Sequence, residues 1–191
     1  TEGVHGLNHI WMDGIPSEEL LKLIKTNDGF VIPTLTVTHS MLQGGWSKDL
    51  LDDESVSTFL HRTQKESWKT TFGVHPRAAQ YTPNVAKSIE QLVAADIPLI
   101  AGTDAPNPGA AYGISLHVEL ELLVKLGLTE IQALRAATSL PAHYFGLGKR
   151  GRIRPGYKAD LLLLDGNPLE DIRNTRMIAQ IWKDGIQYER I

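Results

Sequence analysis

The sequence predicts an α/β fold, and three of its patterns support this prediction. Residues 97–101 are a short apolar run, typical of a strand that is buried on both faces of a parallel sheet. Residues 84–96 have apolar side chains at helical spacing and lead directly into that run, as a covering helix would. After residue 147 the pattern changes to short strands separated by turns such as Pro155-Gly156 and Asp184-Gly185. We therefore expect helices packed on parallel strands, followed by a small β region.

Composition and charge exclude several classes of protein. The chain has 191 residues, 42% hydrophobic and 21% charged, so it is long enough to bury one sizeable core. A formal net charge of -3 and the absence of a basic run give no basis for nucleic-acid binding. No stretch approaches about 18 consecutive apolar residues, so no membrane span is expected. The chain has no cysteine, which leaves histidine and carboxylates as metal ligands and fits a reducing compartment such as the cytoplasm.

A carboxylate lies where the predicted strand of residues 97–101 ends, because the run stops at Gly102-Thr103-Asp104. In barrels of parallel strands the carboxyl ends converge on one mouth, and catalytic groups lie there. Asp104 is therefore the first candidate for a catalytic residue. An aspartate after a strand is also a common N-cap of the next helix or an Asx-turn former, and the sequence leaves both alternatives open.

The N-terminal part of the chain predicts a strand and a helix. Residues 3–10 form the strand, which includes His9, and Pro16-Ser17 then begins the helix. Residues 30–37 are also apolar, but Pro33 removes a hydrogen-bond donor and argues against a regular interior strand.

Loops and helices are predicted for the middle of the chain. Residues 41–53, rich in Gly, Ser and Asp, predict a long loop in the position of an active-site lid. Residues 55–79 predict polar helix. Ser115 is the expected N-cap of a later helix, which would place His117 in its first turn.

The order of elements after Asp104 resembles the amidohydrolase superfamily, and most closely its metal-dependent imidazolonepropionase-like and prolidase-like branch. The resemblance covers almost the whole chain and is densest over residues 102–165. It rests on a helix with His117-Val118-Glu119, a helix capped by Thr129 and ending in Ala136-Ala137-Thr138, and a hairpin from Gly151-Arg152-Ile153 into Ala159-Asp160-Leu161.

The resemblance implies a fold for each part of the chain. Residues 1–147 would be the C-terminal portion of a TIM-type (β/α)8 barrel, with about strands six to eight, and residues 30–37 would be strand seven despite Pro33. Residues 148–191 would be the C-terminal strands of a small composite β-sandwich. Family members are about twice as long, so the chain would be a C-terminal half whose N-terminal half lies in the same or another chain.

The resemblance also implies a metal site. The family's sixth barrel strand ends in Glu-His-Gly, whose histidine binds a metal ion, and Asn8-His9-Ile10 keeps only that histidine. His9 and Asp104 would bind one or two divalent ions, usually zinc, and Asp104 would accept a proton from the attacking water. A complete family site adds a His-x-His pair and a carboxylated lysine, but this sequence has no His-x-His. The chain would supply two ligands at most, fewer than the three typical of catalytic zinc.

Two further histidines are implied as substrate contacts. His39 would lie on the loop after strand seven, at the barrel mouth, with an ordinary solvated histidine as the alternative. His117 would bind substrate from the start of its helix, with a capping or packing role as the alternative. Glu119 and Glu121 cannot both face the site, because residues two apart lie on different helix sides, and both are expected at the surface or behind the ligands.

These features predict a metal-dependent hydrolase that cleaves a carbon-nitrogen bond of an amide, cyclic amide or dipeptide with a metal-activated water. The chain would supply part of the active site. Its expected partners are a small-molecule substrate and the N-terminal half of the barrel, and a homo-oligomer is left open. The alternative is a non-catalytic scaffold or oligomerisation module that kept the fold. A serine or cysteine hydrolase has little support, because the sequence has no Gly-x-Ser-x-Gly and no cysteine.

Overall fold

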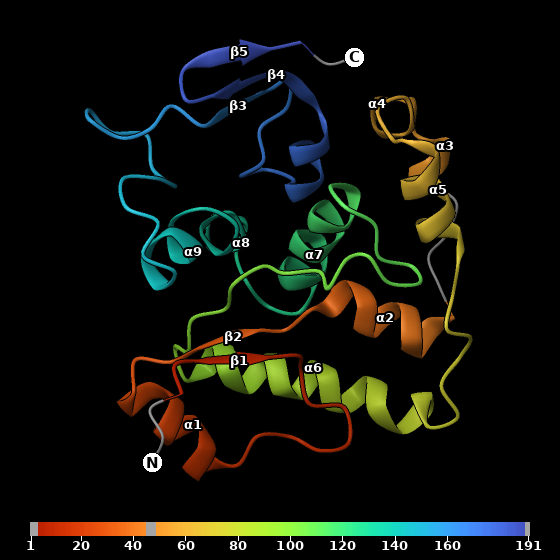
Figure 1. Cartoon of the computed structure of the whole chain (residues 1–191). Coiled ribbons are helices and arrows are strands. Elements are labelled where there is room, and N and C mark those ends of the chain that lie inside the picture. Colours follow the sequence, from red (N-terminus) through yellow and green to blue (C-terminus); the bar gives the residue numbers. More distant parts are fainter. Residues whose placement is uncertain (1–3, 45–48, 190–191) are drawn as a thin grey trace.

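The computed structural model describes residues 4–44 and 49–189 and contains two separate sheets (Figure 1). β1 (Gly6–Asn8) and β2 (Phe30–Ile32) pair in parallel. β3 (Leu161–Leu164), β4 (Ile178–Lys183) and β5 (Ile186–Tyr188) form an antiparallel sheet in that order. In Figure 1 the parallel strands lie in the lower half of the view and the antiparallel sheet lies at the top, with α7 between them.

Helices connect and cover the strands. Their bounds are α1 (Glu18–Thr26), α2 (Leu35–Gln43), α3 (Asp49–Asp52), α4 (Glu54–Ser57), α5 (Arg62–Lys69), α6 (Ala78–Ala94), α7 (Ile114–Lys125), α8 (Glu130–Ala136), α9 (Ser139–Tyr144) and the 3-10 helix η1 (Ile172–Arg176). Side-chain caps confirm two predicted helix starts: Ser17 Oγ accepts from Leu20 N at 3.2 Å, and Thr129 and Gln132 form a capping box. Among the described residues, no helix has the length and apolar character that a membrane crossing requires.

Residues 97–101 extend the parallel sheet on the other side of β2. Val31 N donates a hydrogen bond to Pro98 O at 3.0 Å, and Ile100 N donates to Val31 O at 2.9 Å. The order across the sheet is therefore β1, β2 and then residues 97–101, the order that consecutive strands of a barrel have. The strand predicted at residues 97–101 is present only in part, as an isolated parallel bridge between Leu99 and Val31.

The largest buried cluster lies between the parallel strands and the helices that cover them. Val31 of β2 belongs to it together with Ile89 and Leu92 of α6 and Leu123 of α7, all 0% exposed. Each such side chain contributes roughly 1.5–3 kcal/mol on burial. The amphipathic helix predicted over residues 84–96 is confirmed, although α6 already begins at Ala78.

The strand implied for residues 30–37 is shorter than expected. β2 ends at Ile32, and helix α2 begins at Leu35. Pro33 has no N–H to continue the ladder, and Thr34 turns into the left-handed conformation with φ 50°, so the extended chain stops there.

The long loop predicted over residues 41–53 is wrong within the described residues. α2 continues to Gln43 and α3 begins at Asp49, while residues 45–48 lie outside the described residues. The helix predicted over residues 55–79 is wrong as one element. His61 caps a new helix, α5, after α4, and residues 70–77 are not helical before α6 begins at Ala78.

The C-terminal sheet follows its predicted turn chemistry in one hairpin and departs from it elsewhere. Asp184 and Gly185 have φ of 50° and 82°, as a two-residue turn between β4 and β5 requires. The strand predicted at residues 151–153 is wrong. Gly151 has φ 73°, and a Cβ there would collide with the Thr138 carbonyl, so the backbone is not extended at this position.

Gly102 sets how closely the third strand approaches β2, because a Cβ at this position would collide with the Ile32 side chain. We expect Gly102→Ala to lower the free energy of unfolding by about 1–3 kcal/mol, the usual cost of overpacking, measured by urea denaturation. Gly14→Ala is the matched control, since a Cβ there meets no atom within 4 Å. A Gly102→Ala variant as stable as Gly14→Ala would contradict this account of the packing.

Candidate active site

Three non-glycine residues with left-handed backbone lie where the two parallel strands and the adjacent segment 97–101 end. His9 follows β1, Thr34 follows β2 and Asp104 follows residues 97–101, with φ of 67°, 50° and 54°. Such values are uncommon outside glycine, and each costs on the order of 1–3 kcal/mol unless surrounding contacts compensate. Strained residues gather at functional sites, and barrel enzymes place their chemistry at carboxyl strand ends. The carboxyl ends of these strands are therefore the candidate site.

The ring of His9 is oriented by the residue that follows the neighbouring strand. His9 N donates to Ile32 O at 2.8 Å, and its ring Nδ1 lies 2.9 Å from Thr34 Oγ1. With Nδ1 engaged, Nε2 is the ring nitrogen that can bind a ligand, as in metal-binding histidines whose other nitrogen is hydrogen-bonded. Sequence reasoning identified His9 but missed Thr34, for which the interruption at Pro33 was the available signal.

The carboxylate of Asp104 is exposed and takes neither of its structural alternatives. It does not cap the next helix, because α7 begins at Ile114 with Gly113 as N-cap. Its backbone carbonyl accepts a hydrogen bond from Asn107 Nδ2 at 2.6 Å. The carboxylate itself has no hydrogen-bond or ion-pair partner within residues 4–44 and 49–189, so it is available to a ligand.

The candidate site offers two metal-type donors, His9 and Asp104, on either side of the end of β2. Neighbouring strands lie about 4.8 Å apart, so the two backbones are about 10 Å apart across β2. Imidazole nitrogen and carboxylate oxygen are both zinc-ligand types, and these two residues fit a divalent cation in that respect. In the part of the chain that the structure describes, no group of three or more His, Asp or Glu side chains could hold a metal ion. A third ligand would have to come from elsewhere.

His39 lies on helix α2, so the loop position expected for it is wrong. It is half-buried and lines a cavity of about 330 Å³ between α2, α6 and α7, together with Lys125. Burial lowers the pKa of His39, and the charge of Lys125 lowers it further. Neither His9 nor Asp104 lines this cavity, and the substrate contact of His39 stays a prediction.

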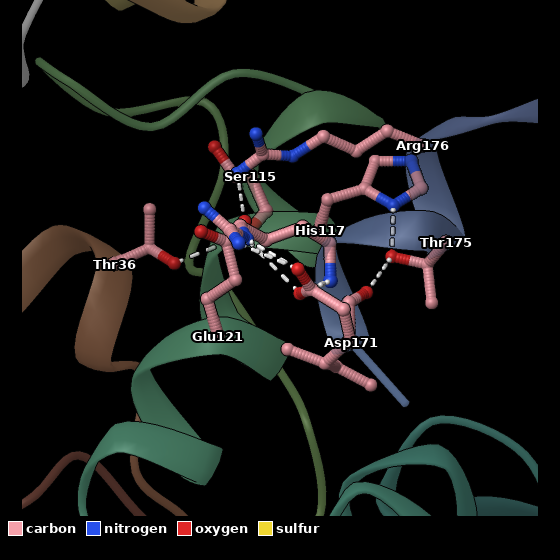
Figure 2. Close-up of polar contacts among 9 residues, drawn as sticks. Thr36, Ser115, His117, Glu121, Asp171, Thr175 and Arg176 are labelled. Carbon is pink, nitrogen blue, oxygen red and sulfur yellow. Dashed lines mark hydrogen bonds and ion pairs between the residues drawn. The ribbon is translucent and has the colours of Figure 1, made fainter. Parts of the chain in front are cut away.

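His117 lies in the first turn of α7, as predicted, and its ring contacts η1 (Figure 2). Its Nδ1 lies 3.0 Å from Thr175 Oγ1. The Thr175 hydroxyl donates to Ile172 O at 2.8 Å, so its oxygen accepts from the Nδ1–H of His117. The expected N-cap, Ser115, is wrong, because Gly113 takes that position and Ser115 lies inside the helix. The packing alternative for His117 therefore has direct support, and its substrate contact stays a prediction.

A buried carboxylate of α7 lies behind the end of β2. Glu119 is 0% exposed and accepts hydrogen bonds from Leu35 N at 2.9 Å, Thr36 N at 2.8 Å and Thr36 Oγ1 at 2.8 Å. Burial raises the pKa of Glu119 to about 7, although these donors act in the opposite direction. Glu121, on another side of the helix, pairs with Arg176 of η1 (Figure 2). Of the two positions expected for Glu119, the surface is excluded.

We expect Glu119→Gln to change the pH dependence of stability. The ordinary pKa of this carboxyl is 4.5 and burial raises it to about 7, so between these values the folded chain binds more protons than the unfolded chain. The wild type therefore loses stability as the pH rises from about 4.5 to about 7, by roughly 3 kcal/mol, and the glutamine variant does not. Urea denaturation at pH 4 and pH 8 measures the difference.

Glu121→Gln is the matched control for this measurement, because Glu121 lies on the same helix and is only partly buried. Parallel pH profiles for the wild type and Glu119→Gln would contradict the burial of a titrating carboxyl.

The parallel strands and their covering helices define an α/β fold, with ligand-type side chains where the strands end. Residues 42–188 match the amidohydrolase family. This is more than half of the chain, and the chain therefore belongs to the amidohydrolase family.

Known proteins similar to this chain are longer than it. Imidazolonepropionase of Deinococcus deserti is 36% identical over 99 residues, which is 50% of this chain and 25% of that protein. Ochratoxinase of Aspergillus niger is 31% identical over 104 residues, or 52% of this chain and 21% of that protein. The chain thus spans about a quarter or less of the curated relatives it matches.

Solved structures cover nearly all of the chain. A Xaa-Pro dipeptidase with bound methionine superposes with a TM-score of 0.69 at 23% identity, over 98% of this chain and 40% of the dipeptidase. The A. niger ochratoxinase structure gives 0.68 at 24% identity, over 97% of this chain and 37% of that one. At this identity the likeness shows the fold alone, which is the TIM-barrel type of the amidohydrolases, present here in part.

Proposed function

We propose that this chain supplies part of the active site of a metal-dependent hydrolase that cleaves carbon-nitrogen bonds. The observation that carries the proposal is the pair His9 and Asp104, two exposed ligand-type side chains on strained backbone at one edge of the parallel sheet. Family membership supports the reaction class, because the similar proteins include an imidazolonepropionase, an ochratoxinase and a Xaa-Pro dipeptidase.

Each of the two residues has a chemical role in this proposal. His9 would bind a divalent cation through Nε2, since Nδ1 is engaged by Thr34. Such a cation, usually zinc, would polarise the substrate carbonyl and lower the pKa of a bound water to about 7. Asp104 would hold the cation, accept the proton of the attacking water and pass it to the leaving nitrogen. An exposed carboxylate without a competing partner suits this transfer.

The rest of the site would come from outside the described residues. We propose that residues 1–147 form the C-terminal portion of the barrel and residues 148–191 the C-terminal strands of a β-sandwich. An N-terminal half of the barrel, in the same or another chain, would add the remaining ligands. The proposed substrate is a small-molecule amide, cyclic amide or dipeptide.

Replacing either donor is expected to remove activity in the protein that carries this chain. His9→Asn and Asp104→Asn each delete the proposed ligand and keep a residue that tolerates positive φ. In Asp104→Asn we expect hydrolysis of Xaa-Pro dipeptides or small cyclic amides to fall at least 100-fold, since a positioned proton-transfer group contributes roughly 100- to 10,000-fold. In His9→Asn we expect it to fall through loss of the proposed metal ligand. Wild-type rates in both variants would reject the proposal.

The matched control for Asp104→Asn is Asp96→Asn. Asp96 also has a positive φ, 54°, but it precedes residues 97–101. It therefore lies at the amino-terminal end of that segment, away from the candidate site. Its replacement is expected to leave the rate unchanged. Unchanged metal affinity in both donor variants would instead favour the non-catalytic scaffold.

Metal content tests the number of ligands. After dialysis against metal-free buffer, we expect the 191-residue chain to retain well below one zinc ion, because two ligands hold zinc less tightly than the three of a catalytic site. Elemental mass spectrometry of the purified chain measures this. One or more ions per chain would show that further ligands in these residues complete the site.

A further inference from the structure

The buried carboxylate of Glu119 has a specific set of partners. Its carboxylate is 0% exposed and, within the described residues, has no ion-pair partner. Removing a carboxylate from water without a cation is unfavourable, but an apolar side chain there would leave the buried donors of Leu35 and Thr36 without an acceptor. Glu119 therefore does something that a leucine at this position would not do.

Glu119 caps a helix to which it does not belong. Leu35 and Thr36 are the first two residues of α2, and both of their backbone N–H groups donate to the Glu119 carboxylate, at 2.9 and 2.8 Å. These N–H groups have no partner within their own helix. A carboxylate near the positive end of the helix dipole is also favourable. The first turn of α2 is thus held by α7.

This external cap changes what Thr34 does. A threonine at the N-cap position usually adopts extended backbone and accepts a hydrogen bond from its own helix. Thr34 instead has φ 50° and ψ 49° and makes no capping bond. Its hydroxyl lies 2.9 Å from His9 Nδ1. Glu119 occupies the Thr36 N–H, one of the two groups that an N-cap side chain usually accepts from, and the Thr34 hydroxyl instead lies against His9.

We propose that Glu119 is a positioning residue that orients the ring of His9 through Thr34. The carboxylate fixes the first turn of α2, this turn fixes the left-handed backbone of Thr34, and the Thr34 hydroxyl engages Nδ1 so that Nε2 is the nitrogen left for a ligand. The orientation itself is a property of the metal-free chain. Its use in catalysis rests on the proposed function.

Histidine ring nitrogen resonances test the proposal directly. In the 15N-labelled, metal-free chain, Thr34→Val removes the hydroxyl and is expected to shift the His9 ring resonances. Glu119→Gln keeps the shape but turns one acceptor into a donor, and should shift them in the same direction. If Glu119 acts through Thr34, the double variant shifts the His9 ring resonances no further than Thr34→Val alone. Thr34→Ser, which keeps the hydroxyl, should retain the wild-type resonances.

Glu121→Gln is the matched control, since it removes the same charge from the same helix. The Glu121 side chain contacts η1 and, among the described residues, makes no hydrogen bond or ion pair with α2. This variant is expected to leave the His9 ring resonances unchanged. A Glu119→Gln variant with wild-type His9 resonances, in which Thr34→Val still shifts them, would overturn the proposal. If Glu119→Gln does not fold, Thr36→Val removes one of the three donors to Glu119 and should shift His9 less but in the same direction. No shift in that variant would also overturn it.

Cobalt binding separates this proposal from the proposed function. In the protein that carries this chain, Glu119→Gln should weaken Co²⁺ binding by roughly 10- to 100-fold, as changes behind a metal ligand do. Absence of Co²⁺ binding in the wild type would reject the proposed metal function and leave the resonance coupling as the support for positioning. Co²⁺ binding without resonance coupling would reject positioning and leave the metal function standing.

Discussion

Backbone hydrogen bonds on both sides of β2 are the constraint on which the candidate site depends. His9 N donates to Ile32 O, and Ile100 N donates to Val31 O, so both neighbouring strands are held level with β2. The two strands and residues 97–101 therefore end together and bring the residues that follow them close to one another. A slip of one residue would move every side chain to the opposite face. Burial of Val31, which is 0% exposed, opposes such a slip in a strand of only three residues.

Features of the fold that depend on local pattern could be predicted from the sequence. The apolar run at residues 97–101 lies beside β2 in an isolated parallel bridge, and Ser17 caps α1, because the signals lie within a few residues of each feature. The start of α2 could not be predicted. Leu35 is capped by a carboxylate 84 residues further along the chain, so a segment that is apolar enough for a strand turns into a helix instead. Contacts over such a distance are absent from any local window.

Residues of the candidate site also differ in whether the sequence could predict them. Asp104 and His9 could be found from residue type and from their position after a strand. Thr34 and Glu119 could not, because their roles are defined by partners on other elements. One local sign was present: Glu119 lies four residues before Leu123, which is fully buried, so it shares a buried helix face. Two glutamates separated by a single residue thus have different surroundings and different roles.

Helix α7 also contacts the C-terminal part of the chain, through the pairs Glu121–Arg176 and His117–Thr175 (Figure 2). The helix that caps α2 is therefore anchored from its other side by η1. Segments linked in this way open together, with one shared free energy of local unfolding. Through α7, therefore, we expect substitutions that loosen η1 to disorder the ends of the parallel strands without contacting them.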